Sequence, residues 1–135
     1  MNDKNFNFED WWTETLRQCA VAAIDEDHAL PTFNIVETNA VTGQRIPNTP
    51  TYQMRGLCGF AWVSIRPARG KLVSWLKSKN LGHTDSYAGG FKIWIGSNFP
   101  GGSTQSVDVK EAIAGVVAKR INELGVKAYV GSRLD

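Results

Sequence analysis

The chain has 135 residues, of which 42% are hydrophobic and 21% are charged. These values are close to those of an average globular domain, and they exclude a disordered, collagen-like or disulfide-rich chain. No apolar run approaches about 18 residues and the N-terminus is polar and acidic, so we expect no membrane span and no secretory signal. Two cysteines in such a chain predict reduced thiols and a cytoplasmic location. We therefore expect a single domain over residues 1–135.

The charges are unevenly distributed, although the formal net charge is only +2. Residues 1–37 contain eight acids and two bases, whereas residues 38–135 contain five acids and 13 bases. The stretch 38–84 has seven bases and no acid. Such asymmetry favours a polyanionic partner. The alternative is that an acidic first helix lies beside the basic surface, so that the two regions neutralise each other.

Residues 8–27 have the pattern of an amphipathic helix. Asn7 is a suitable N-cap, and Glu9 and Asp10 lie in the first turn, where the helix dipole favours negative charge. The apolar residues that recur at helical spacing are expected to face the core. They are Trp12, Leu16, Cys19, Ala20, Ala23 and Ile24.

The segment after this helix is predicted to be extended and then irregular. Pro31 closes the helical pattern, and a short strand is expected over residues 33–37. Residues 38–56 contain two prolines, two glycines and many threonines and asparagines. This composition predicts a long polar loop or a loose hairpin, of a length that is unusual inside a compact domain. We expect it to be either a mobile arm or a binding loop.

The rest of the chain alternates between predicted strands and helices. In chain order we expect a strand at 57–65, a helix at 71–79, a strand at 91–95, a helix at 106–124 and a strand at 126–130. The first of these strands is apolar on both faces and is expected to be central. The connections are too short for a doubly wound fold. We therefore predict an α+β fold, in which a mixed sheet of about four strands packs against three helices.

The strongest functional signal is the basic stretch that follows the predicted central strand. Its cations are Arg66, Arg69, Lys71, Lys77 and Lys79. Arginines in a turn can place their forked donors on phosphate or carboxylate groups. Trp75 could stack on a base, but its spacing with Leu72 and Leu76 favours a place in the core. The stretch fits nucleic acid and an acidic protein surface equally well.

A second candidate site is the glycine-rich loop before the last helix. Its small and hydroxyl-bearing residues are Gly101, Gly102, Ser103, Thr104 and Ser106. Consecutive amides, hydroxyls and the positive end of a helix dipole can together hold an anion, so this loop could bind a phosphorylated ligand against Tyr87 and Trp94. It lacks the Gly-Lys-Ser/Thr ending of a P-loop. A loop that merely caps the helix explains the same residues.

A third hypothesis is a cysteine-dependent enzyme. Cys58, His83 and Asp85 supply the residue types of a nucleophile, a base and an orienting acid. Nothing in their spacing fixes a contact, and Cys58 lies in an apolar strand, where a buried and inert thiol is the default. The two histidines and two cysteines offer no metal-ligand spacing, so we expect no metal and no cofactor.

Three segments within residues 58–135 carry a resemblance to known proteins, and they read CGFAWVSIRPARGKLVSWLK, HTDSYAGGFKIWI and QSVDVKEAIAGVVAKRINELGVKAYVGSRLD. They resemble a group of small proteins encoded by tailed bacteriophages. The group has no assigned activity, so the resemblance implies no site residue. It implies a phage accessory product in the cytoplasm of the bacterial host.

Together these predictions favour a non-enzymatic protein that binds nucleic acid, or a nucleic-acid-handling complex of host or phage, through its basic stretch. The ligand-binding loop and the cysteine-dependent enzyme are the alternatives. Trp94 and Tyr129 lie on predicted strands that can form sheet edges, so a dimer is open as well.

Overall fold

The computed structural model describes residues 6–48 and 52–135, and for residues 33–35 and 52–55 it describes the backbone alone. In chain order, the elements of this described part are α1 (Phe8–Ala29), β1 (Thr32–Ile35), β2 (Tyr52–Arg55), β3 (Gly59–Ile65), α2 (Lys71–Ser78), β4 (His83–Thr84), β5 (Phe91–Trp94), α3 (Val107–Glu123) and β6 (Ala128–Leu134). The predicted α+β class is confirmed.

Four strands form the main sheet, in the order β4-β5-β3-β6. At the centre, Ile65 of β3 is paired with Phe91 of β5 on one side and with Ala128 of β6 on the other. All three strand pairings are antiparallel, in contrast to the mixed sheet that the sequence predicts. The reason is the path of α3, which carries the chain across β3. As a result β6 pairs with β3 and not with β5. β5 and β6 run in the same direction, but they are separated by β3 and form no parallel pair.

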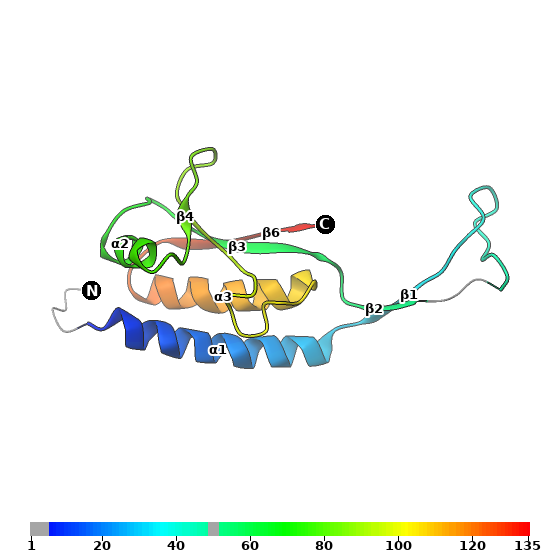
Figure 1. Ribbon diagram of the computed structural model, residues 1–135, viewed down its shortest axis with the longest axis horizontal. Helices are drawn as coiled ribbons and strands as arrows, with labels where there is room; N and C mark the ends of the chain where they lie inside the picture. Colours follow the sequence, from blue (N-terminus) through cyan, green and yellow to red (C-terminus); the bar gives the residue numbers. More distant parts are fainter. Residues whose placement is uncertain (1–5, 49–51) are drawn as a thin grey trace.

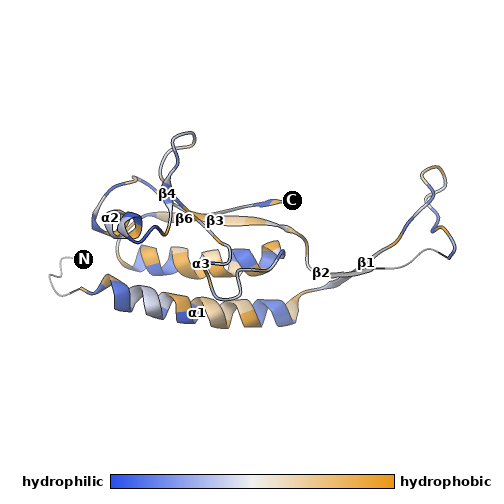
Figure 2. Cartoon of the chain, viewed as in Figure 1, coloured by the Kyte–Doolittle hydropathy of each residue, from blue (hydrophilic) through white to orange (hydrophobic). Residues whose placement is uncertain are grey.

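Both long helices lie on one side of this sheet (Figure 1). α3 packs against β3 and β6, and α1 packs against α3. Ile113, Val117 and Ile121 of α3 are fully buried, and the hydrophobic colour follows β3 and recurs along α3 in Figure 2. Leu72 and Leu76 of α2 complete the same core. Among the described elements, none of the helices lies on the opposite side of the sheet (Figure 1).

α1 confirms its predicted cap but not the whole of its predicted core face. The Asn7 side chain accepts hydrogen bonds from the amides of Glu9 and Asp10, at 2.9 and 3.1 Å. Cys19 is fully buried, whereas Ile24 is 57% exposed. This difference arises because α1 packs mainly against one other helix, a narrow contact that leaves the edge of an apolar stripe open.

β3 is not buried on both faces as the sequence predicts. Its residues are alternately buried and accessible. Val63 and Ile65 face the helices and are fully buried, whereas Phe60 and Trp62 face the side without helices. The apolar composition of this strand therefore reflects two different environments, a core on one side and an accessible aromatic surface on the other.

β1 and β2 form a separate two-stranded sheet that extends away from the body of the molecule (Figure 1). Within the predicted loop at 38–56, Thr38 and Arg45 form a β-bridge, and the Gly43 amide donates to the Asn39 carbonyl at 2.8 Å. Of the two predicted forms, a loop or a hairpin, the structure has the hairpin. Residues 49–51 lie outside the described residues.

Two strand boundaries differ from the predictions. β6 continues to Leu134, where the sequence predicts a tail after residue 130. Its last residues pair with the start of β3, with Leu134 opposite Gly59, so long-range pairing outweighs the weak strand propensity of Gly131 and Ser132. β4 lies in a segment that the sequence predicts to be a polar loop, and its two residues pair with β5.

Candidate functional site

The side of the sheet without helices is the main candidate site, and we call it the outer face. It consists of the strand residues that alternate with the buried ones. They are Phe60, Trp62, Ser64, His83, Lys92, Trp94, Tyr129, Gly131 and Arg133. Four of these nine residues are aromatic and none is acidic. The outer face therefore combines ring surface with positive charge.

Trp62 and Trp94 form the centre of the outer face. They lie directly opposite each other on β3 and β5, with ring centroids 5.0 Å apart and planes inclined by 52°. Trp94 is 37% exposed. The Trp62 indole lies over Gly131, where a Cβ atom would be 2.4 Å from the ring. The absence of a side chain at Gly131 thus lets the Trp62 indole approach the neighbouring strand closely, next to the Trp94 ring.

The ammonium group of Lys92 lies beside both indoles. Its Nζ lies 4.9 Å from the Trp62 ring centroid and 5.2 Å from that of Trp94, within the range of a cation–π contact. The same Nζ forms an ion pair with Asp85 Oδ2 at 3.0 Å, and both side chains are largely buried. Asp85 belongs to the loop between β4 and β5, so this loop fixes the lysine against the aromatic pair.

The pKa of Asp85 is lowered from its ordinary value of 3.8 to about 2. The Ala88 amide, which donates to Asp85 Oδ1 at 3.0 Å, is the largest cause, followed by Lys92 and then by the Tyr87 amide. Because the pKa is lower in the folded chain, the charged carboxylate stabilises the fold above about pH 4. This stabilisation is lost as the pH falls toward 2.

We expect the Asp85 carboxyl carbon to titrate near pH 2 in a carbon-13 NMR series. Replacing Lys92 by methionine should raise this pKa but leave it below 3.8, because the Ala88 amide, the largest cause, remains. Lys119→Met, which removes an exposed lysine of α3, is the control and should leave the Asp85 titration unchanged. An unchanged midpoint in Lys92→Met would contradict the ion pair.

A second cation–π cluster lies near the start of β3, around the Phe60 ring. The Arg133 guanidinium carbon is 5.2 Å from the Phe60 ring centroid, and Lys110 Nζ is 5.3 Å from it. Lys110 reaches this position from α3, and its Nζ donates to the Gly59 carbonyl at 3.1 Å. Phe60 is 36% exposed, so the ring stays accessible although two cations contact it.

The outer face continues past the ends of β3 and β6 into a hollow of about 640 Å³. The Arg66 amide donates to the Lys127 carbonyl at 3.3 Å, which extends the pairing of these strands by one residue. Arg66, Arg69 and Lys127 line the hollow together with Tyr129, which is 55% exposed. Two of the five predicted cations thus lie together, next to the outer face.

The other three predicted cations lie on α2 or directly after it. Lys71 and Lys77 are exposed. Lys79 Nζ forms an ion pair with Glu9 Oε1 of α1 at 2.6 Å, as the neutralisation alternative predicts for this residue. Both side chains of that pair are accessible to solvent, so it contributes little to stability. Trp75 packs against aromatic rings of α1, in the position that its helical spacing predicts.

The glycine-rich loop uses its polar groups for its own structure. The Ser106 hydroxyl accepts from the Val109 amide at 3.3 Å and caps α3, and the Thr104 hydroxyl accepts from the Ser106 amide at 3.0 Å. Gly101 faces α1, where a Cβ atom would be 2.6 Å from Ala23 Cβ. Two of the three predicted hydroxyl groups, those of Thr104 and Ser106, therefore accept backbone hydrogen bonds at the start of α3.

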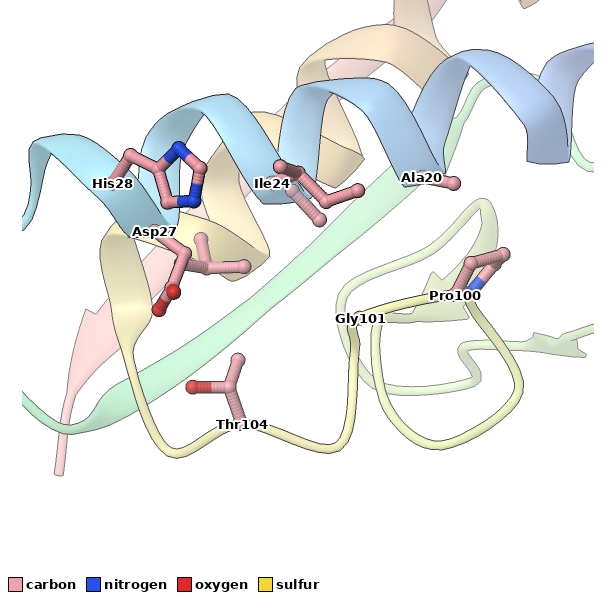
Figure 3. A pocket seen from close by; sticks show the side chains of 9 residues that line it. Ala20, Ile24, Asp27, His28, Pro100, Gly101 and Thr104 are labelled. Carbon is pink, nitrogen blue, oxygen red and sulfur yellow. The ribbon is translucent and has the colours of Figure 1, made fainter.

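The groove between this loop and α1 has a volume of about 380 Å³ (Figure 3). Ile24 and Pro100 make it mainly apolar, and Asp27 and His28 add a carboxylate and an imidazole to its lining. Tyr87 is fully exposed on the loop between β4 and β5, and Trp94 lies on the outer face, so neither lines the groove. The groove therefore differs from the predicted ligand site, in which Tyr87 and Trp94 faced the glycine-rich loop.

Cys58, His83 and Asp85 do not come together. Cys58 forms a β-bridge with Ser106 just before β3 begins, whereas His83 lies on β4, two strands from β3. His83 is paired with Lys92, and Lys92 is paired with Ser64 of β3. Ser64 is six residues beyond Cys58, which corresponds to roughly 20 Å along the strand. Asp85 is paired with Lys92 instead. Cys58 and His83 are therefore too far apart to act as a nucleophile and its base.

The described part of the chain also lacks two other kinds of site. It contains no group of three histidine, cysteine, aspartate or glutamate residues that could hold a metal ion. Its helices are either too short or too polar to cross a membrane. Burial raises the pKa of the Cys19 thiol to about 12, so this cysteine is expected to stay protonated and unreactive.

Sequence reasoning missed Phe60, Trp62 and Arg133 as site residues. A signal for the first two was present, because Trp62 is followed by Ser64 at the same parity, and a polar residue there indicates an accessible face. Arg133 lay in a predicted tail, so its place beside Phe60 depends on strand pairing that no local pattern reveals.

Comparisons with protein-family models, with curated proteins and with solved structures give no match for this chain. The resemblance to phage proteins therefore stays a prediction.

Proposed function

We propose that the protein binds single-stranded nucleic acid across the outer face of its sheet, without catalysing a reaction. The observation that carries this proposal is the pair of adjacent, accessible indoles at Trp62 and Trp94, with a cation beside them. Aromatic side chains on an open sheet stack with unpaired bases, and the affinity is tolerant of sequence because every base has a π-face.

The charge distribution supports the same partner. The residues of the outer face include no acid, and Arg133 lies near one end of it while Arg66 and Arg69 lie near the other. A single nucleic-acid strand that runs from the Phe60 ring across the two indoles would thus contact cations at both ends of the face. Asp85 contacts the face through its ion pair with Lys92, which balances its charge.

The aromatic surface favours single strands over duplexes. In a duplex the bases are stacked on each other, so they cannot also stack on Trp62 and Trp94 without being unpaired. In the described part of the chain, the outer face also carries no helix that could enter a major groove. A duplex could use only the cations, and it should therefore bind more weakly.

Fluorescence anisotropy with a labelled 12-nucleotide DNA strand and with its duplex tests the proposal. We expect the single strand to bind at least tenfold more tightly and to quench tryptophan fluorescence. If about three phosphates are contacted, the plot of log affinity against log salt should have a slope near −2. Equal binding of both forms, or no binding of either, would contradict the proposal. In the latter case an acidic protein becomes the partner to test.

A further inference from the structure

The hollow at the end of the sheet has the features of a site for a phosphate group. Arg66 follows the outward-facing residues of β3, and Lys127 lies beside it through the backbone hydrogen bond between the two residues. Arg69 lines the same hollow from the turn before α2. Within the part of the chain that the structure describes, the side chains of these three cations have neither an ion pair nor a hydrogen bond.

The electrostatic balance of the hollow remains positive. None of the described residues that line it is an aspartate or a glutamate. The C-terminal end of α3 is close by, because Gly125 and Val126 belong to the lining, and its dipole contributes about half a negative charge. Glu123 at that end ion-pairs with Arg120 at 3.6 Å. Three cations exceed the dipole, so an anion with more than one charge fits the site best.

We propose that this hollow holds the terminal phosphate of the bound strand, with Arg66, Arg69 and Lys127 on the phosphate oxygens and Tyr129 against the last base. A phosphomonoester carries nearly two charges at neutral pH and exposes three oxygens, whereas a phosphodiester within the strand carries one charge. The forked donors of two arginines and the ammonium group of a lysine match the three oxygens. Tyr129 lies opposite Ser64 on the outer face, so the base would continue the stack toward Trp62.

This inference rests on the proposed function and adds an end preference to it. The test uses three 12-nucleotide strands of one sequence, with a 5′-phosphate, with a 3′-phosphate and with two hydroxyl ends. We expect one phosphorylated strand to bind about tenfold more tightly than the hydroxyl strand, and the preferred end gives the polarity of binding. This preference should shrink at pH 5, where the monoester has lost its second charge.

The double variant Arg66→Gln/Arg69→Gln should reduce the preference to within twofold. Lys71→Gln/Lys77→Gln removes the same charge from exposed residues of α2 and should keep the preference. Because Arg66 also contacts the region of Gly90, Tyr129→Leu serves as a second variant, and melting temperatures verify folding. Equal affinity for all three strands would overturn the phosphate site while leaving strand binding intact. Failure of every strand to bind would overturn both proposals.

Discussion

Replacing Trp94 by alanine should weaken the binding of single-stranded DNA by about 5- to 150-fold. This range corresponds to the loss of one base–aromatic stacking contact, which is worth about 1–3 kcal/mol. Trp94 is the more exposed indole of the pair, and its ring also supports Trp62, with the two ring centroids 5.0 Å apart. Its removal therefore shortens the aromatic surface and loosens the ring that remains. Anisotropy titration at fixed salt measures the change.

Two variants show whether the ring itself is responsible. Trp94→Phe keeps an aromatic face and should retain most of the affinity. Ile24→Ala removes an apolar side chain of α1 that is more exposed than Trp94, on the far side of α3 from the sheet, and should bind like the unchanged protein. Equal losses in Trp94→Ala and Ile24→Ala would show that the outer face is not the binding surface.

Replacing Phe91 by alanine should instead cause a large loss of folding stability. Among the described residues, Phe91 is the largest fully buried side chain, and it lies on β5 three residues before Trp94. Its ring occupies the space beside Gly82, where a Cβ atom would be 2.7 Å from the ring. Truncation of a buried phenylalanine costs about 3–5 kcal/mol, because the cavity collapses only in part.

This loss is a large fraction of the free energy of unfolding of an ordinary domain, about 5–15 kcal/mol. We expect the melting temperature in differential scanning calorimetry to fall by about 10 °C or more. Trp94→Ala is the matched control on the same strand, and its melting temperature should change by only a few degrees, since its ring faces solvent. A Phe91→Ala protein that melts like the unchanged chain would contradict the buried position of this ring.

The comparison of these two residues also shows what the sequence could predict. The alternation of residues 91–95 correctly places Phe91 and Ile93 in the core and Trp94 on the other face. The caps of α1 and α3 could be predicted from Asn7 and Ser106, because a capping side chain acts within its own turn. Strand alternation and helix capping both depend on residues that are close together in the sequence.

The candidate site was harder to predict from the sequence, because it depends on which strands pair with each other in the sheet. Arg66 and Lys127 are far apart in the chain, and only the pairing of β3 with β6 brings them together. Lys79 carries the same charge as Arg66, yet the position of α1 pairs it with Glu9. Composition identified the basic stretch, but long-range contacts decide which of its cations share a surface.

The order of the strands has a consequence for how the chain acquires its structure during synthesis. β3 is followed by both of its neighbours, β5 and β6, and the pairing with β6 covers every residue from Gly59 to Ile65. A ribosome that adds about 5–20 residues per second completes β6 several seconds after β3. During this interval the nascent β3 has no partner along its β6 edge, and its aromatic and aliphatic side chains are open to chaperones.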